Sequence, residues 1–498
     1  MLQNVQDIFS QKEKRGLNNA RDIFSLTPGE SPECLNVVFD YDAFVGKRLG
    51  TSSSNAAKLS SSATSAGYGM FDFGVGSIPQ ERRLLVAVNS GILYSTNVGR
   101  TFTVCETGRT VSINNFAFVK NYVINCNDAY DVPLFWAGSV ASHFSALAVN
   151  SAPLCKYPDS HQGYMFLLNE QNKKRSIYYT DESDMFSTSA WSNFQLPTVR
   201  NDEICGSFHL RTRFYVHTKY RLFNLFFVGG NPDWSYEEIK EWGFVPRTVK
   251  KIQIPEAGTE AVIGLDWTKR IRIFDGTNDY IISSNIEKNN NMTSFYLDNL
   301  NESALLKCWA ENDMKAQKYR LHIPYGTAKD CNYSIVFDYR TGALYPEDGR
   351  NYGSGIIAQD TAHGLQMVAC TTDGWLHYID SGNTDSGTAI NDKFVSSFLF
   401  KDTPSKVNKN QRIELFFSQT SSGTLNFEER NDFSNIWDLN KSFDLVSGLS
   451  ITQTSQSIDI RSLTNVYQFK LSSSANKADA WEMNRFDYYQ TAKGIGRA

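Results

Sequence analysis

Several arginines in strand-like runs are the first residues whose chemistry could make a site. They are Arg211, Arg213, Arg221, Arg270, Arg272 and Arg320. An enzyme that hydrolyses glycosides of acidic sugars needs clustered arginines to hold a carboxylate and a Tyr/Glu pair for nucleophilic attack. The chain has 24 Tyr, so suitable residue types occur in many places, and the spacing of the arginines singles out no site. We therefore predict no catalytic residues and expect these arginines to form surface or inter-subunit ion pairs.

Metal-binding residue types are present without the spacing that metal sites need. The acidic turn DESD at 181–184 could hold calcium, but it lacks the glycine and the distal glutamate of an EF-hand loop. His209 and His217 are eight residues apart and His161 stands alone, which predicts no zinc site. The eight cysteines are widely separated, with no C-x-x-C pair. We predict no metal and no cofactor, and we expect buried, reduced thiols.

The elements that would position these residues are short strands. From about Arg82, apolar or alternating runs are bounded by Gly, Asn, Asp and Thr, with turns at Asn89-Ser90-Gly91 and Thr372-Asp373-Gly374. Such hairpins recur every 30 to 60 residues or so, the spacing of propeller blades. Blades stack radially because a four-stranded sheet cannot bury both faces alone. We predict an all-β chain with a β-propeller of about five to seven blades over residues 81–400; two ordinary β-sandwiches are the alternative.

The flanking regions differ in composition from this repeat. Residues 1–80 are polar and include a Ser/Ala-rich stretch, which predicts an extended N-terminal arm and linker that lies along other surfaces. The chain is polar again near residue 405, and alternating runs follow, which predicts a small C-terminal β-sandwich over residues 401–498. The segment DWSYEEIKEWG at 233–243 has apolar positions at helical spacing. We expect it to form a helix in a loop between blades.

Residues 94–103 resemble the Asp-box motif S-x-D-x-G-x-x-W of sialidases and other propellers. Asn97 stands where Asp is usual, and Phe102 stands where Trp is usual. Ser95 and Asn97 can hydrogen-bond the turn backbone. Gly99 can adopt a positive φ, and Phe102 can cap the sheet. In those families the box is a turn between outer strands, so the resemblance implies a propeller and says nothing about hydrolysis.

Size, charge and hydropathy limit the possible functions. The chain has 498 residues, enough for two or three domains, and its 13% aromatic content favours strands. A net charge of −4 predicts no general attraction to nucleic acid or anionic membranes. The N-terminal residues are polar and no run approaches eighteen apolar residues, so we predict neither a secretory signal nor a membrane span. We expect a soluble protein made in a cytoplasm.

Residues 16–50 carry a pattern of turn and strand residues. A Gly-Leu-Asn start leads to a Leu-x-Pro-Gly-Glu turn, a Leu-Asn-Val-x-Phe strand and an ending with Gly, Lys-Arg and Gly. The residues that carry it are Gly16, Leu17, Asn18, Leu26, Pro28, Gly29, Glu30, Leu35, Asn36, Val37, Phe39, Asp40, Gly46, Lys47, Arg48 and Gly50. The pattern resembles the opening of a group of bacteriophage tail structural proteins, which usually have Pro where Leu49 stands here. Residues 466–498 resemble the closing strands of the same group.

This resemblance implies a place in a virion and no catalysis. It implies the tail hub or nozzle of a short-tailed phage, a ring subunit below the portal and adaptor through which DNA is ejected. We expect a cyclic homo-oligomer, a hexamer, built from heterologous contacts. Other tail or portal-adaptor proteins are the expected partners, and DNA would pass through the channel without sequence-specific binding. The expected location is the virion, after synthesis in the cytoplasm of the bacterial host.

Two other functions fit the same sequence. A receptor- or carbohydrate-binding propeller at the tail tip would stack exposed aromatic rings on sugars. Its candidate residues are Trp234, Trp242, Trp309 and Trp375. A packing role is favoured for each of these tryptophans. The third hypothesis is a propeller-type glycosidase, which would need the arginines above to converge on one cleft.

Overall fold

The computed structural model describes residues 16–492 apart from short internal segments. Those segments are residues 20–24, 40–43, 61–65, 76–80, 98–100, 148–151, 187–190, 199–200, 231, 255–257, 287–296, 361–363, 401–407, 419–420, 433, 446–454, 461–462 and 474–479. Asp40, Gly99, the polar region after residue 400 and the last residues of the closing segment therefore lie outside the described residues. The 3-10 helices η3 (Ser283–Ile286) and η4 (Glu302–Lys307) are short, and no helix in the described part of the chain is long and apolar enough to cross a membrane.

Five antiparallel four-stranded sheets follow one another along the chain. Blade 1 contains β7 (Ala66–Gly74), β8 (Arg82–Val88), β9 (Gly91–Ser95) and β10 (Thr103–Glu106), and blade 2 contains β11 (Asn114–Val119), β12 (Tyr122–Asn127), β13 (Leu134–Trp136) and β14 (Ser145–Ala146). Blade 3 contains β15 (Cys155–His161), β16 (Tyr164–Glu170), β17 (Ser176–Asp181) and β18 (Ser192–Gln195). Blade 4 contains β19 (Ile204–Leu210), β20 (Arg213–Thr218), β21 (Leu222–Phe227) and β22 (Trp234–Lys240). Blade 5 contains β23 (Lys250–Ile254), β24 (Thr259–Leu265), β25 (Ile271–Phe274) and β26 (Asp279–Ile281).

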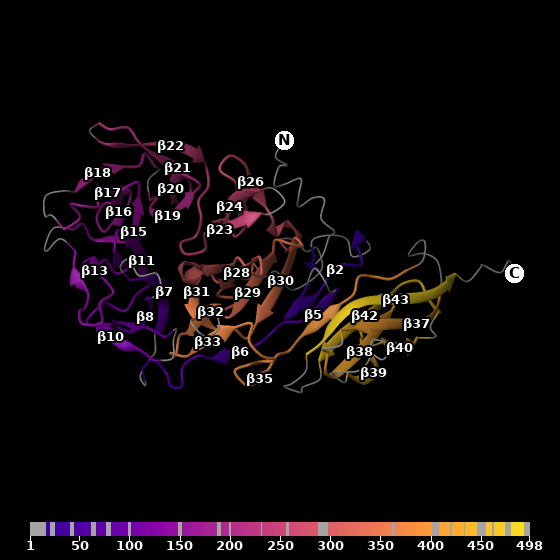
Figure 1. The fold of residues 1–498 in the computed structure, drawn as a ribbon. Helices are drawn as coiled ribbons and strands as arrows, with labels where there is room; N and C mark the ends of the chain where they lie inside the picture. Colours follow the sequence, from indigo (N-terminus) through magenta and orange to yellow (C-terminus); the bar gives the residue numbers. More distant parts are fainter. Residues whose placement is uncertain are drawn as a thin grey trace.

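Blades 6 and 7 include strands from the beginning of the chain. Blade 6 contains β27 (Trp309–Asp313), β28 (Lys318–Ile323), β29 (Tyr333–Asp338) and β30 (Ala343–Asp348), extended by β1 (Gly16–Leu17) and β2 (Glu30–Ser31). Blade 7 contains β31 (Tyr352–Asp360), β32 (Gly364–Thr371) and β33 (Leu376–Ile379), followed by β6 (Thr51–Ser53), β34 (Thr384–Asp385) and β35 (Thr388–Ala389). The first strand of blade 7, β31, packs beside β7 of blade 1. The seven blades thus close into a ring, and β6 supplies the fourth strand of the last blade (Figure 1).

The C-terminal domain is a β-sandwich that also uses the beginning of the chain. One sheet runs β3 (Cys34–Leu35), β36 (Lys393–Val395), β42 (Tyr467–Ser473), β38 (Gly423–Asn431) and β39 (Asp438–Leu445). The other runs β4 (Val37–Val38), β5 (Val45–Lys47), β43 (Glu482–Ala492), β37 (Asn408–Phe417) and β40 (Ser455–Asp459), with β41 (Leu463–Thr464) also paired to β37. In Figure 1 the indigo strand β5 lies between the propeller and the yellow strands of the sandwich, and β6 lies beside β33 of the propeller.

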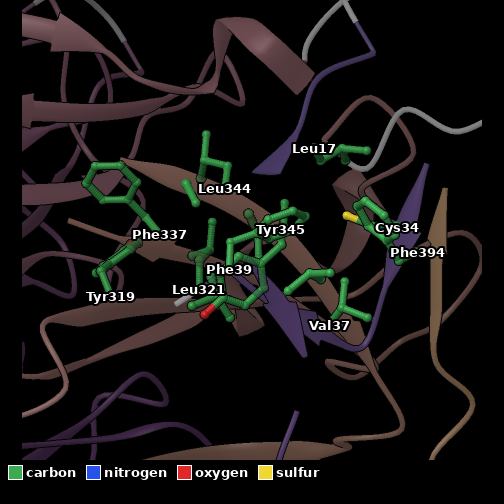
Figure 2. Close-up of a cluster of buried hydrophobic side chains, with 14 of the residues drawn as sticks. Leu17, Cys34, Val37, Phe39, Tyr319, Leu321, Phe337, Leu344, Tyr345 and Phe394 are labelled. Carbon is green, nitrogen blue, oxygen red and sulfur yellow. The ribbon is translucent and has the colours of Figure 1, made fainter. Parts of the chain in front are cut away.

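One hydrophobic core joins the propeller to the sandwich. Phe39 of the N-terminal segment is fully buried and packs against Tyr345 of blade 6 and Phe394 of β36, with ring centroids 6.0 and 6.2 Å apart. Figure 2 shows Leu17 and Cys34 in the same cluster. The two domains are therefore held together by apolar packing as well as by shared strands.

The predicted fold class is confirmed: the chain is an all-β propeller with an N-terminal arm and a small β-sandwich. The predicted turns at Asn89-Ser90 and Thr372-Asp373-Gly374 connect paired strands, and Asn89 has the positive φ, 50°, that a tight hairpin requires. Two predicted boundaries are wrong. The propeller begins before residue 81, because β7 at Ala66–Gly74 belongs to blade 1, and the sandwich begins before residue 401, because β36 at Lys393–Val395 belongs to its first sheet.

The predicted helix at 233–243 is wrong, because β22 occupies most of this segment. Trp234 and Tyr236 point to one face of the blade, as the two-residue period of a strand demands. Trp234 packs against Phe166 at 5.1 Å, and Tyr236 stacks on Phe194 at 6.0 Å. Packing of these aromatic rings between blades 3 and 4 outweighs the helical spacing of the other apolar positions.

Candidate functional site: the N-terminal segment and the central cavity

The N-terminal segment, residues 16–53, supplies strands to four sheets. β1 runs parallel to β30 of blade 6, and β6 runs antiparallel to β33 of blade 7. β3 pairs with β36 in one sheet of the sandwich, and β5 pairs with β43 in the other. The segment therefore connects both domains through backbone hydrogen bonds. The residues whose pattern resembles that of phage tail proteins lie within this connection.

Arg48 and Asn36 form the centre of the connection. The Arg48 side chain is 2% exposed and donates to both carboxylate oxygens of Asp385, to Asn36 Oδ1 (2.9 Å) and to the Asp348 carbonyl (2.8 Å). Asn36 has a φ of 54° and also donates to the Asp348 carboxylate. The fork of a guanidinium suits such a set of acceptors. This pair thus ties the N-terminal segment to blade 6 and to the strands that follow blade 7.

A buried charge network lies beside Arg48, between blades 6 and 7. It consists of Glu311, Arg320, Glu347, Arg350 and Asp380. Arg320 donates to all three carboxylates at 2.9–3.2 Å, and Arg350 bonds Glu347 at 2.7 Å and Asp380 at 2.8 Å. Burial alone would raise the pKa of Glu347, but the two guanidinium groups hold that pKa below its ordinary value. The carboxylates are therefore ionised at neutral pH, and each depends on its arginine partners.

Two further contacts fix the ends of the N-terminal segment. Glu30 accepts hydrogen bonds from Asn18 Nδ2 (2.6 Å) and from the Thr27 backbone (2.9 Å), which closes the Pro-Gly turn. Lys47 Nζ lies 3.6 Å from Asp392, and both side chains are almost completely buried. Glu30 and Lys47 belong to the sequence pattern over residues 16–50. Their contacts hold the backbone of the N-terminal segment in place.

The centre of the propeller contains a cavity of about 500 Å³ that residues from all seven inner strands line. Two cations reach it from one place: Lys250 begins β23, and Arg247 lies three residues earlier, with a φ of 66°. Burial lowers the pKa of the Arg247 guanidinium, and burial together with the nearby Arg247 charge lowers the pKa of the Lys250 ammonium. The cavity is thus a positively charged space of ligand size.

The six arginines that lie in strand-like runs of the sequence do not converge on one site. Arg221 pairs with Glu238, Arg272 pairs with Asp266 and Asp279, and Arg320 belongs to the buried charge network. Arg211, Arg213 and Arg270 are exposed. Ion pairs on or near the surface are therefore found for Arg221 and Arg272, whereas Arg320 forms buried pairs within the chain, contrary to the expectation of surface or inter-subunit pairs. The burial of Arg320 was not foreseen.

The histidines are arranged differently from the prediction. His161 does not stand alone: its ring lies 5.2 Å from that of His209, because β15 and β19 begin neighbouring blades. His209 Nδ1 is 4.0 Å from Asp159. Asp181 of the acidic turn accepts hydrogen bonds from the Ser183 backbone (2.8 Å) and hydroxyl (2.6 Å). In the part of the chain that the structure describes, no three His, Cys, Asp or Glu side chains are grouped to hold a metal.

The Asp-box lies between β9 and β10, the two outer strands of blade 1, as the motif implies. Asn97 Oδ1 accepts a hydrogen bond from the Thr101 backbone at 3.0 Å, and the Asn97 backbone donates to Ser95 Oγ at 3.3 Å. Phe102 packs against the core between blades 1 and 7. The motif therefore acts as a turn.

The four candidate tryptophans have structural partners. Trp234 and Trp309 are 1% and 2% exposed. Trp309 stacks on His322 with ring centroids 3.9 Å apart and donates to the Tyr352 carbonyl at 3.0 Å. Trp242 lies under the Arg272 guanidinium, and Trp375 is half-buried in the turn between β32 and β33. Packing accounts for Trp234, Trp242 and Trp309.

All eight cysteines are buried and unpaired. Burial raises their thiol pKa values, for Cys126 to about 12, so thiolate is scarce at neutral pH. We expect the native protein to leave all eight thiols unreacted with Ellman's reagent at pH 8 over an hour, and the denatured protein to titrate all eight. One thiol that reacts within seconds in the native protein would contradict this expectation.

Two groups of residues were not found by sequence reasoning. The partners of Arg320 and Arg350 come from blades 6 and 7, and nothing in their spacing indicates a network. Arg247 and Lys250 occur in an ordinary basic run, and only closure of the ring places them in a cavity. Arg48 and Asn36, by contrast, belong to the pattern over residues 16–50.

No protein-family model matches the sequence, and no curated protein matches it. Three similar solved structures are an extracellular domain described as part of a hybrid two-component system of B. thetaiotaomicron (12% identity, TM-score 0.40), a quinoprotein alcohol dehydrogenase-like protein of Bacteroides thetaiotaomicron (9%, 0.39) and hydrazine synthase of Kuenenia stuttgartiensis (9%, 0.39). The matches cover 75%, 59% and 60% of this chain, and 45%, 68% and 92% of the other chains. The chain thus spans less than half of the first one. Likenesses this weak carry no argument about activity.

Proposed function

We propose that this chain is a non-catalytic structural subunit of a bacteriophage tail, where copies of it form the hub or nozzle ring. In this proposal six copies make the ring below the portal and adaptor, and portal-adaptor and other tail proteins are its partners. DNA passes through the lumen between the copies without sequence-specific binding. The protein acts in the virion.

The observation that carries the proposal is the use that the fold makes of residues 16–50. Asn36 and Arg48, which belong to the pattern that resembles phage tail proteins, join the propeller to the sandwich, and Lys47 of the same pattern forms an ion pair inside the sandwich. A rigid connection between two domains suits a subunit that carries load between neighbours in an assembly. The support is thus a match between the resemblance and the structural role of its residues.

The size of the central cavity supports a lumen outside the propeller. A cavity of about 500 Å³ holds a small molecule and not a DNA duplex. In the proposed ring the DNA channel is therefore formed by several copies around a common axis, and the propeller lies in its wall.

The open edge of the sandwich offers a surface for a second copy. Among the described strands, β39 is the last of its sheet, so one row of its backbone groups has no partner in a described strand. Ile436 and Leu439, beside and on this strand, are 70% and 62% exposed. Exposed apolar side chains next to an unpaired strand edge favour addition of a strand from a neighbour.

The proposed ring can be tested directly. We expect recombinant protein to form closed rings with sixfold symmetry in mass photometry and negative-stain electron microscopy, and an antibody against the chain to label the tail of the phage. A protein that is monomeric from nanomolar to tens of micromolar concentration and is absent from virions would contradict the proposal.

The double substitution Ile436→Asp with Leu439→Asp tests the open edge of the sandwich. Charge at these positions would be desolvated by a neighbouring copy, so we expect the ring dissociation constant to rise at least about a hundredfold. Val140→Asp, at a 63% exposed position of blade 2, should leave assembly unchanged. Rings of unaltered stability in the double variant would place the interface elsewhere.

A further inference from the structure

The central cavity holds two cations that the described part of the chain leaves without an ionic partner. Arg247 Nη2 donates to the Gly353 carbonyl at 2.8 Å, but its Nη1 is buried and has no hydrogen-bond partner. Neither Arg247 nor Lys250 has a described carboxylate within ion-pair distance; Asp128 and Glu311 act on them only from farther away. A buried donor without a partner is costly, so Arg247 Nη1 needs an acceptor, and the half-buried Lys250 adds a second positive charge beside it.

The acid that lines the same cavity does not serve as this acceptor. Asp159 accepts hydrogen bonds from Ser207 Oγ at 2.5 Å and from the Ser160 backbone at 2.8 Å, and His209 Nδ1 lies 4.0 Å from it. Glu311 is bonded by Arg320 at 2.9 Å. Glu311 Oε2 has no hydrogen-bond partner, but neither Asp159 nor Glu311 lies within ion-pair distance of Arg247 or Lys250. The unmet demand of Arg247 Nη1 is therefore for an acceptor from outside the described chain.

The remaining lining fits a small organic molecule. Phe71 and Phe116 stack with ring centroids 5.9 Å apart at the cavity, and Tyr157 and Trp309 also line it. Apolar rings with a few charged groups are typical of small-molecule sites, and about 500 Å³ lies within their usual range. A guanidinium accepts a carboxylate in a two-pronged geometry, and a lysine adds a point charge.

We propose that the central cavity binds a small organic carboxylate, with its carboxylate group held by Arg247 and Lys250 and the rest of the ligand lying against the aromatic lining. This site needs only the closed propeller and is independent of ring assembly. It would make the subunit responsive to a ligand at the one place where all seven blades meet.

Isothermal titration calorimetry on the full chain tests the site with two carboxylate and neutral pairs: benzoate against benzamide, and glucuronate against glucose. We expect at least one carboxylate to bind at least about tenfold more tightly than its neutral partner, because a charge-assisted hydrogen bond is worth that much or more. Arg247→Gln and Lys250→Gln should each weaken this binding at least about tenfold. Arg213→Gln, at an exposed arginine of β20, should leave it unchanged.

The outcomes separate the proposal from its alternatives. Failure of both carboxylates to bind, equal binding of a neutral partner, or binding of inorganic phosphate alone would overturn it. Retained affinity in folded Lys250→Gln protein would overturn it too. If Arg247→Gln does not fold, the affinities of Lys250→Gln and of the neutral ligands still test the proposed carboxylate site.

Discussion

Replacing Arg320 with Met should lower the free energy of unfolding by about 3–5 kcal/mol at pH 7, the usual cost of removing one partner from a buried ion pair. Arg320 is 3% exposed and bonds Glu311, Glu347 and Asp380. Methionine fills a similar volume but leaves Arg350 as the remaining guanidinium of the network. Guanidinium chloride denaturation followed by tryptophan fluorescence measures the loss.

The pH dependence identifies the cause of this loss. In the native protein burial would raise the pKa of Glu347, but Arg350 and Arg320 hold it below its ordinary value. The stability that the ionised Glu347 contributes is present above about pH 4.5 and is lost as the pH falls through the pKa of Glu347 in the folded protein. Without Arg320 the buried carboxylates have raised pKa values and take up protons. The difference between variant and native protein should therefore shrink between pH 7 and pH 4.5.

Arg221→Met is the matched control. Arg221 pairs with Glu238, and the two side chains are 28% and 33% exposed, so its loss should cost less than about 1 kcal/mol. If Arg320→Met also lowered the free energy of unfolding by less than about 1 kcal/mol, or by the same amount at pH 7 and pH 4.5, the buried charge network would not stabilise the fold as described.

Gly50→Val should disrupt the closure of the propeller ring. It should lower the free energy of unfolding by about 3 kcal/mol or more. A Cβ atom at residue 50 would lie 2.0 Å from the Thr384 carbonyl oxygen, which is backbone and cannot rotate away. Gly50 also exchanges backbone hydrogen bonds with Gly382 and Ser381, directly before β6. The clash therefore displaces β6 from β33. Thermal unfolding and limited proteolysis of residues 51–60 would detect this change.

Gly74→Val is the control for this substitution. A Cβ atom at Gly74 meets nothing within 4 Å, and Gly74 ends a strand, where valine is favoured. We expect the free energy of unfolding to change by less than about 1 kcal/mol. Similar losses for the two variants would mean that the approach of Gly50 to Thr384 does not limit closure of the ring.

Local turn chemistry explains which parts of the fold could be predicted. Asn89 and Gly374 have positive φ values in hairpin turns, and the preference of Asn and Gly for such values is visible in sequence. β6 gives no such signal. Thr51–Ser53 forms a strand only because β33 offers an open edge, and no local pattern reports a partner so far along the chain.

The candidate site was harder to predict for a related reason. Arg320 was recognised as a residue of interest, but its acceptor Glu347 lies on another strand and its acceptor Asp380 follows β33 of blade 7. The burial of Arg320 and Glu347 depends on how blades 6 and 7 pack. Arg247 and Lys250 are close in sequence, yet their isolation from carboxylates follows from the six other blades. Electrostatic environments of this kind are properties of the closed ring.

The shared strands also determine the order in which the molecule can mature during synthesis. Asn55, just after β6, accepts a hydrogen bond from the Leu376 backbone, 321 residues later. At about 5–20 residues per second, roughly 15 to 65 s pass before that partner leaves the ribosome. Until then β6 has no partner strand, and the earlier blades form an arc with two open ends. Chaperones of the producing cell would therefore act chiefly on this interval, and slow translation would lengthen it.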